Sequence, residues 1–231
     1  MEQSNIVVRV AILSDIVYAT TITDEMASSA KARGTGIAQR TPDYIIEKIV
    51  EGKAVIALTK DNNAWVGFCY IEAWGHDKFV ANSGLIVAPE FRKTGVAKLI
   101  KKRIFALSRE KYPESKIFGL TTGLAVMKIN SELGYEPVTY GELTDDDNFW
   151  AGCKSCVNYD ILMSKNRTNC MCTAMLYDPK DHLSPKETAQ DFKENSSLYE
   201  RFMRLKANKM MRFLKKKKAE KNSLLHFFLN F

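Results

Sequence analysis

The sequence predicts an α/β (α+β) fold, in which a mixed, mostly antiparallel twisted sheet is flanked by helices. Three apolar runs at residues 54–58, 65–73 and 79–87 are separated by turn-forming residues, which predicts three successive antiparallel strands. Residues 94–111 then carry apolar side chains at helical spacing. A fourth apolar run at residues 117–121 can return parallel to the third strand through a right-handed crossover.

The remaining elements follow from shorter signals in the sequence. Residues 6–13 predict a first strand followed by a helix, and two glycines place a loop over residues 28–39. A Thr-Pro pair at residues 41–42 begins a short helix, because Thr caps helices and Pro suits the first helical position. Residues 124–133 predict the last helix of this region, and Tyr135 begins another strand.

The turn before the long helix has the features of an anion-binding loop. A strand that leads through a tight turn into a helix leaves several backbone N–H groups without acceptors at the helix N-terminus. These groups and the positive end of the helix dipole favour a phosphate or pyrophosphate. Gly95 lies in this turn and allows a ligand to approach the backbone closely.

Two segments resemble the GNAT acyltransferases. The pattern Arg92-x-x-Gly95-x-Ala97, which follows a strand and a Pro-Glu-aromatic triplet, is similar to the coenzyme A pyrophosphate loop of that family. The Leu-Gly-Tyr sequence at residues 133–135 resembles the end of a later helix of the family. The resemblance covers residues 6–137 and does not extend to the rest of the chain.

This resemblance implies a GNAT acyl-CoA N-acyltransferase domain over residues 1–150, with acetyl-CoA or another acyl-CoA as cosubstrate. In the family, the strand before the loop splays from its parallel neighbour, and its backbone pairs with the pantetheine arm. An N–H at or near Val87 would polarise the thioester oxygen. The residues expected to bind the coenzyme are Leu85, Ile86, Val87, Arg92, Lys93, Thr94, Gly95, Val96, Ala97 and Lys98.

The expected catalytic residues are Glu72, Asn130 and Tyr135. Many relatives place a Tyr as leaving-group acid where this chain has Asn130, and Asn cannot donate a proton as an acid, although it can form hydrogen bonds to the sulfur or the pantetheine. Tyr135 or Tyr140 could substitute, or the thiolate could leave unassisted. Glu72 is the expected general base, since apolar neighbours would raise the pKa of its carboxyl, although a solvent-facing Glu72 is the open alternative. His76 suits a turn.

The function that the resemblance implies is transfer of an acetyl or other short acyl group, such as succinyl, to the amine of a small molecule. The expected acceptor is an amino acid such as glutamate, as on the bacterial route to arginine, which indicates amino-acid metabolism. Lys31, Arg33 and Arg40 could bind its carboxylate or could simply be surface charges. Two alternatives stay open: a protein N-terminal or lysine acetyltransferase, and a non-catalytic acyl-CoA-sensing module that binds nucleic acid.

Residues 151–180 form a segment rich in cysteine. The pattern Cys153-x2-Cys156-x13-Cys170-x-Cys172 suits a tetrahedral structural zinc, held by a hairpin with strand character over residues 157–163. The alternative is four reduced thiols, some of them buried. The sequence therefore predicts a small Cys-rich subdomain, with zinc as a candidate structural metal.

The charge is divided unevenly along the chain. Residues 180–231 carry 13 Lys and Arg against 6 Asp and Glu, and the whole chain carries 34 against 27, so residues 1–179 hold 21 of each. The basic character belongs to a helical tail over residues 181–231, so the overall charge gives no reason to expect nucleic acid as a partner. Docking of this tail on a second copy leaves a homodimer open. Without a secretion signal or a membrane-spanning run, we expect a cytoplasmic protein with no membrane partner.

Overall fold

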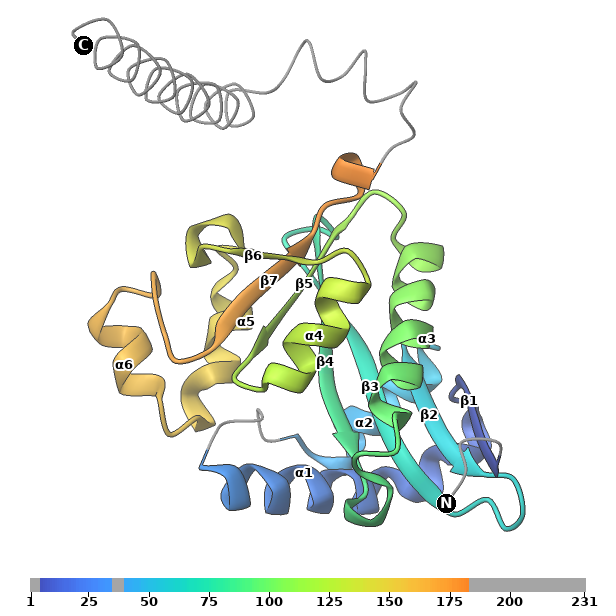
Figure 1. Ribbon diagram of the computed structural model, residues 1–231. Helices are drawn as coiled ribbons and strands as arrows, with labels where there is room; N and C mark the ends of the chain where they lie inside the picture. The colour runs from blue at the N-terminus through green and yellow to red at the C-terminus, as the bar shows by residue number, and fades with distance from the viewer. Residues whose placement is uncertain (1–4, 35–39, 183–231) are drawn as a thin grey trace, which may run out of the picture. The chain divides into compact units, whose positions relative to one another are not determined.

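The computed structural model describes residues 5–34 and 40–182. Its centre is a seven-stranded sheet with the order β1-β2-β3-β4-β5-β7-β6 (Figure 1). All neighbouring strands are antiparallel except β4 and β5, which are parallel. This confirms the predicted mixed, mostly antiparallel sheet. The strands are β1 (Ile6–Val10), β2 (Ala54–Thr59), β3 (Trp65–Trp74), β4 (Phe79–Val87), β5 (Lys116–Thr121), β6 (Glu136–Val138) and β7 (Thr173–Tyr177).

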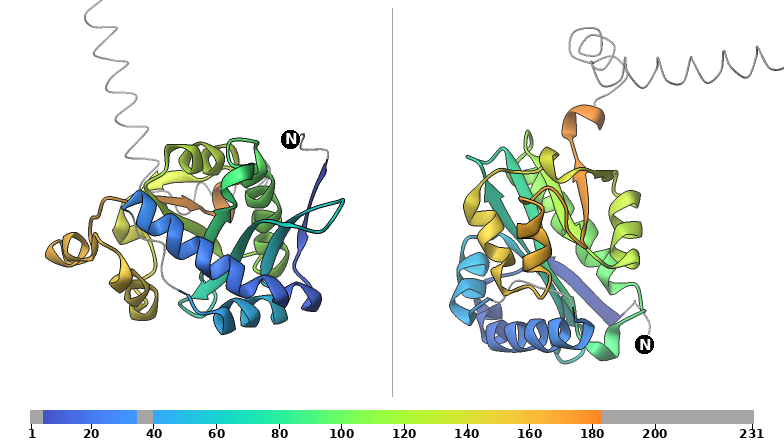
Figure 2. Two further views of the ribbon diagram at one scale, coloured as in Figure 1. Left: turned by 90° about the horizontal axis from the view of Figure 1, so that it is seen from below. Right: turned by 90° about the vertical axis from the view of Figure 1, so that its left-hand side faces the viewer.

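Helices cover both faces of the sheet (Figure 2). Alternate residues of a strand point to opposite faces, and the two cores follow that rule: Ile56 packs in a cluster with residues of α1 and α2, whereas Val55 packs in a cluster with residues of α3. The partly buried Met127 of α4 packs against the α3 cluster. The helices are α1 (Ala19–Arg33), α2 (Pro42–Val50), α3 (Val96–Lys111), α4 (Leu124–Glu132), α5 (Asp147–Ala151) and α6 (Tyr159–Ser164).

The segment between the first two strands departs in part from the prediction. A 3-10 helix over Leu13–Tyr18 leads into α1, and α1 continues to Arg33, where a loop was expected from residue 28. The short helix α2 begins as predicted, because the Thr41 side chain accepts a hydrogen bond from the Tyr44 backbone N–H. Residues 28–33 include two Ala, a Lys and an Arg, which favour a helix, so α1 continues until the first of the two glycines, Gly34, ends it.

A buried carboxylate fixes the chain after β1. Asp15 is only 2% exposed, and its oxygens accept hydrogen bonds from the Arg9 guanidinium at 2.6 and 2.9 Å and from the Ile12 backbone N–H at 2.7 Å. Burial alone would raise the pKa of the Asp15 carboxyl, but these donors together hold it below its ordinary value.

We expect the substitution Asp15→Asn to lower the free energy of unfolding by about 2 kcal/mol at pH 7, because a paired buried charge is replaced by an amide. Since the pKa of Asp15 is lower in the folded state, its stabilisation is present above the unfolded pKa of about 4 and is lost as the pH falls through the folded value. Urea unfolding at pH 7 and pH 3 tests both statements. If Asp15→Asn lowered the free energy of unfolding by the same amount at both pH values, the lowered pKa of Asp15 in the folded state would be contradicted.

The sheet opens between β4 and β5. Their pairing is confined to Phe79–Ala81 of β4 and residues 116–118 of β5, and beyond it the two strands diverge (Figure 1). The pairing of β4 with β3 also shifts its register between Phe68 and Tyr70 of β3. Gly84 lies opposite this shift with a φ of +64°, so β4 contains a bulge there. The predicted splay of the third long strand from its parallel neighbour is therefore present.

The Cys-rich segment contributes to the same sheet. Strand β7 inserts between β5 and β6 and is antiparallel to both. The prediction of a strand over residues 157–163 was wrong, because Tyr159–Ser164 is the short helix α6. A first compact unit runs from Met1 to Asp181, so residues 151–180 share the fold of the preceding residues. The predicted helical tail lies, from residue 183 onward, outside the described residues. Within the described part, no helix is long and apolar enough to cross a membrane.

Candidate active site

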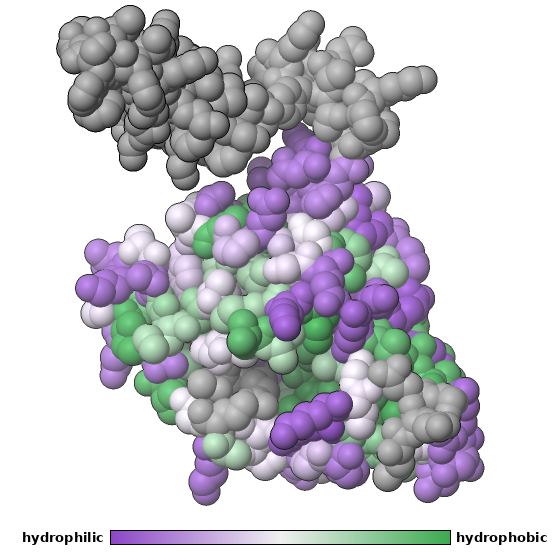
Figure 3. All heavy atoms as spheres, in the orientation of Figure 1, coloured by the Kyte–Doolittle hydropathy of each residue, from purple (hydrophilic) through white to green (hydrophobic). Residues whose placement is uncertain are grey.

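A cavity of about 350 Å³ lies where β4 and β5 diverge. Its wall includes the bulged stretch of β4, with Asn82 and Gly84, and the end of β5 with the turn that follows it. Trp150 and residues of the Cys-rich segment, among them Cys153 and Tyr159, complete the wall. Seen from the side of Figure 1, apolar and weakly polar residues occupy much of the middle of the molecule, with hydrophilic residues toward its margins (Figure 3). The volume suits a small ligand or part of a larger one.

The cavity is lined from both faces of the sheet. On the side of α1 and α2 it contacts Arg40, Tyr70 and Glu72. On the side of α3 and α4 it contacts Lys101 and Asn130. The gap between β4 and β5 therefore connects two groups of polar side chains that the sheet would otherwise separate. We call them the α2 end and the α3 end of the cavity.

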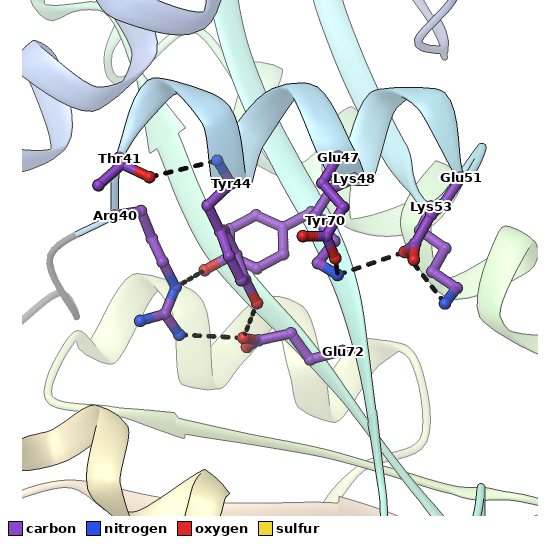
Figure 4. A network of polar contacts seen from close by, with 9 residues as sticks. All are labelled: Arg40, Thr41, Tyr44, Glu47, Lys48, Glu51, Lys53, Tyr70 and Glu72. Carbon is purple, nitrogen blue, oxygen red and sulfur yellow. Dashed lines mark hydrogen bonds and ion pairs between the residues drawn. The ribbon is translucent and has the colours of Figure 1, made fainter.

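The α2 end is a network around one carboxylate (Figure 4). Glu72 is 6% exposed, and its Oε1 accepts hydrogen bonds from Arg40 Nη2 at 2.9 Å and from the Tyr44 hydroxyl. Arg40 Nε also donates to the Tyr70 hydroxyl at 3.0 Å. Burial opposes the charge of Arg40, but Tyr70 and Glu72 raise the pKa of the guanidinium above its ordinary value. Burial and the adjacent Glu72 raise the pKa of Tyr44. Arg40 and Glu72 are thus a charged pair, and both tyrosines stay neutral hydroxyls.

Glu72, the predicted general base, lies on the cavity wall as such a base must. Its surroundings differ from those expected, because a guanidinium and a phenol hydroxyl bind its Oε1 where apolar neighbours were expected. Glu72 remains a candidate base, and its visible function is to orient Arg40 and Tyr44. His76 and Asp77 occupy the turn between β3 and β4 and are exposed, which agrees with a turn role for His76.

The α3 end holds Asn130, which the sequence placed where relatives have a Tyr. Asn130 is 1% exposed and lines the cavity, its Nδ2 lies 3.8 Å from the sulfur of Met175, and its Oδ1 has no hydrogen-bond partner. Tyr135 lies in the core, and its hydroxyl donates to Asn82 Oδ1 at 3.0 Å. Burial raises the pKa of Tyr135 well above its ordinary value. Tyr135 therefore orients Asn82, which lines the cavity, while Tyr135 itself is not among the lining residues. Its catalytic role remains a prediction.

The predicted coenzyme loop has the expected backbone form. Gly95 is the N-cap of α3 with a φ of +88°, and Lys93 has a φ of +64°, so the turn bends sharply before the helix begins. The side chain of Arg92 is used within the protein: it donates to Val87 O at 3.1 Å and to Glu25 Oε1 at 2.5 Å. In the predicted coenzyme-binding role, the backbone N–H groups at the start of α3 would therefore contribute more than Arg92.

The three β4 residues predicted to bind the pantetheine lie in different environments. Leu85 lines the cavity. Ile86 and Val87 are 3% and 9% exposed, and their side chains pack in the two cores on opposite faces of the sheet. Beyond Ala81 the strand has no pairing with β5. The main-chain N–H and C=O groups on that edge therefore have no partner strand, and a ligand can form hydrogen bonds with them as an added strand would. The main-chain role proposed for residues 85–87 remains a prediction.

We expect the substitution Gly84→Ala to destabilise the protein by about 3 kcal/mol and to disorder the α2 end. A Cβ at position 84 would lie 2.2 Å from Tyr70 Cε1 and 2.9 Å from Met26 Cε, on a backbone of positive φ. Gly119→Ala is the matched control on the same cavity wall, where the new Cβ would lie 3.8 Å from Asn130 Nδ2. Thermal unfolding of both variants tests the prediction, and equal stabilities would count against the bulge geometry.

The four cysteines of the C-terminal segment lie on the cavity wall as free thiols. Burial raises the pKa of Cys153 to about 11 and that of Cys172 to about 12, and neighbouring cysteines add to both shifts. The thiols are therefore gathered in one region. Among the described residues, however, no group of three or more His, Cys, Asp or Glu side chains is arranged to hold a metal ion. The predicted zinc site is therefore not supported by the described residues.

Solved structures with the same architecture were found. Rv2747 from Mycobacterium tuberculosis, solved with CoA, is 18% identical with a TM-score of 0.53, over 74% of this chain and 98% of that chain. N-acetylglutamate synthase from Neisseria gonorrhoeae, solved with coenzyme A and N-acetyl-glutamate, is 15% identical with a TM-score of 0.52, over 75% of this chain. A GNAT superfamily phosphinothricin acetyltransferase from Sinorhizobium meliloti, solved with AcCoA, is 14% identical with a TM-score of 0.50, over 75% of this chain and 88% of that chain. The fold is that of the GNAT acyltransferases.

The match to this GNAT fold is structural. No protein-family model and no curated protein matches the sequence. The chain spans only 35% of the length of the gonococcal synthase. The predicted GNAT fold is therefore confirmed.

Sequence reasoning missed two residues of the site, Lys101 and Tyr70, whereas it did consider Tyr44 as a residue that could line the acceptor pocket or simply pack. Tyr44 and Tyr70 belong to α2 and β3 and meet only because these elements pack together. Lys101 carried a signal that was overlooked. It lies four residues after Ala97 and three before Ile104, on the side of α3 that faces the sheet.

Proposed function

We propose that the protein is an acyl-CoA-dependent N-acyltransferase that acylates the amine of a small molecule. The observation that carries this proposal is the cavity that joins both faces of the sheet and is lined by Lys101 of α3, the helix that follows the predicted coenzyme loop. The start of α3 offers N–H groups for a pyrophosphate, and the unpaired edge of β4 offers main-chain groups for the pantetheine. The coenzyme then approaches from the α3 end, and the acceptor amine from the α2 end.

The α2 end supports an acceptor that carries a carboxylate, such as an amino acid. Arg40 holds a positive charge on the cavity wall, and Glu72 and Tyr70 fix the direction of its guanidinium. A fixed guanidinium suits a carboxylate, because both groups are planar and can form two parallel hydrogen bonds. Of the predicted cationic candidates, Lys31 is exposed, and the side chain of Arg33 lies outside what the structure describes. The gonococcal neighbour was solved with N-acetyl-glutamate bound, so glutamate is the first acceptor to test.

The transfer itself needs no covalent intermediate on the protein, since a thioester is already activated. The amine nitrogen attacks the thioester carbonyl carbon, and the C–S bond breaks with its electron pair on sulfur. The proton of the attacking amine leaves toward the α2 end, where Glu72 is the carboxylate in reach of the cavity. A main-chain N–H of the β4 bulge polarises the carbonyl oxygen in this proposal.

Release of free CoA thiol by the purified chain tests the proposed function. The donors are acetyl-CoA and succinyl-CoA, and the acceptors are glutamate, other amino acids, their amine counterparts without the α-carboxylate, and a lysine-containing peptide. We expect turnover with carboxylate-bearing amines and at least tenfold lower kcat/KM with the counterparts. A counterpart without the carboxylate leaves the buried Arg40 guanidinium without that hydrogen-bond partner, which costs binding energy. Preference for the peptide would support a protein acetyltransferase, and binding of acyl-CoA without any turnover would support an acyl-CoA sensor.

A further inference from the structure

The α3 end of the cavity contains a buried lysine that the reaction above does not yet use. Lys101 projects from the middle of α3, is 2% exposed and contributes to the cavity wall beside Asn82 and Asn130. Its Nζ lies 5.3 Å from the centroid of the Tyr135 ring. In the part of the chain that the structure describes, this Nζ forms no ion pair and no hydrogen bond.

The groups that surround Lys101 are neutral. The titratable side chains that face it are the Cys69 thiol of β3 and the Tyr135 phenol that follows α4. Burial raises the pKa of Cys69 to about 11, and the thiol donates to Ser83 O at 3.2 Å. Glu72 lies on the opposite face of the sheet, in its pair with Arg40. A buried ammonium without a nearby anion is costly, and burial accordingly lowers the pKa of Lys101 below its ordinary value of 10.5.

A buried lysine that lies on a cavity wall without an anionic partner suits a place where negative charge develops during a reaction. Lys101 is on the side of the sheet where α3 begins, which is the side of the coenzyme in the proposed function. The negative charge that develops on that side during acyl transfer is on the sulfur of departing CoA. Asn130 cannot supply a proton there, and the hydroxyl of Tyr135 is bound to Asn82.

We propose that Lys101 is a catalytic residue that protonates the sulfur of CoA as the C–S bond breaks. The inference rests on the proposed acyltransferase function and assigns its leaving-group acid. The electron pair of the C–S bond moves to sulfur, and a Lys101 Nζ–H donates its proton to that sulfur. Free CoA thiol and a neutral Lys101 amine result, and the amine takes up a proton from solvent once CoA has left. In this step the forming thiolate and the ammonium neutralise each other.

The test compares Lys101→Met with Lys102→Met, which removes the exposed neighbouring lysine of the same helix. We expect Lys101→Met to lower kcat roughly 100-fold, the lower range for loss of a general acid, because a thiolate can also leave unassisted. KM for acyl-CoA and calorimetric binding of CoA should stay near the wild-type values. Thermal stability should not fall, since an apolar side chain of similar length replaces a buried cation. Lys102→Met should behave as the wild type.

Two further readouts separate proton donation from a structural role. The kcat of the wild type should fall as the pH rises through the pKa of Lys101, because the acid must be protonated, and this limb should be absent from Lys101→Met. The thiol of bound CoA, followed through thiolate absorbance without any acceptor, should ionise at lower pH in the wild type than in Lys101→Met, since an ammonium nearby stabilises the thiolate.

The outcomes distinguish the two proposals. Wild-type protein that turns over no donor with any acceptor would remove the acyltransferase function itself. Wild-type turnover together with an unchanged kcat in Lys101→Met would overturn the role of Lys101 alone. A loss restricted to succinyl-CoA, with acetyl-CoA unaffected, would also overturn it, because Lys101 would then bind a carboxylate of the acyl chain.

Discussion

Replacement of Gly95 by Val is expected to abolish detectable binding of CoA while the domain stays folded. Gly95 has a φ of +88° at the start of α3, a conformation that a β-branched residue adopts only at a cost of about 1–3 kcal/mol. A turn that relaxes away from this conformation no longer directs its N–H groups at a phosphate, and the new side chain occupies the approach to the loop. We expect Kd for CoA to rise at least roughly 100-fold, measured by calorimetric titration.

Gly134→Val is the matched control for this prediction. Gly134 also has a left-handed backbone conformation, with a φ of +89°, but it follows α4 and is not part of the loop. Thermal unfolding should show comparable losses of stability for the two variants, whereas only Gly95→Val should lose CoA. If Gly95→Val binds CoA as the wild type does, the loop at the start of α3 is not the coenzyme site.

Replacement of Arg40 by Gln is expected to raise KM for a carboxylate-bearing acceptor about 100-fold, the effect of losing a charge-assisted, two-point contact. Binding of CoA should be unchanged, because Arg40 lies at the α2 end of the cavity. Steady-state kinetics with the acceptor and its counterpart lacking the carboxylate give the measurement. The counterpart should be affected little, since it never contacts the guanidinium.

This substitution also leaves the Glu72 carboxylate buried without its cation, so a loss of stability accompanies it. The double variant Arg40→Gln/Glu72→Gln removes both charges and should recover much of that stability without recovering acceptor binding. Recovery of both together would show that Arg40 acts only by keeping the site folded. Equal effects on the acceptor and on its counterpart would likewise refute recognition of a carboxylate.

The long helix and the loop before it could be read from local sequence. Gly95, the Pro that ends the preceding strand and the apolar spacing of residues 96–107 each act over a few residues, so their effect does not depend on distant contacts. The same holds for the Thr41 cap of α2, which the structure reproduces. Where local signals were weak, the prediction failed: α1 is longer than expected, and Tyr159–Ser164 is a helix where a strand was expected.

The position of β7 lay beyond such reasoning. Its strand follows a cysteine-rich segment, and the cysteine spacing directed attention to a metal. In the structure β7 joins the sheet between β5 and β6, and the preceding cysteines become part of the cavity wall. The position of a strand in a sheet depends on which strand edges are still unpaired when that strand is added. The spacing of cysteines along the chain carries no information about those edges.

By itself, the sequence determined the three central antiparallel strands, the helical crossover to the parallel strand, the backbone turn at Gly95 and the resemblance to the GNAT acyltransferases, because all of these depend on residues close together in the chain. Only the tertiary structure decided the composition of the site. Arg40 meets Glu72 across 32 residues of sequence because α2 packs on β3. Lys101 reaches the same cavity from the other face because β4 and β5 part after three paired residues. Contacts of this kind depend on register and packing between distant segments, which hydrophobic periodicity does not specify.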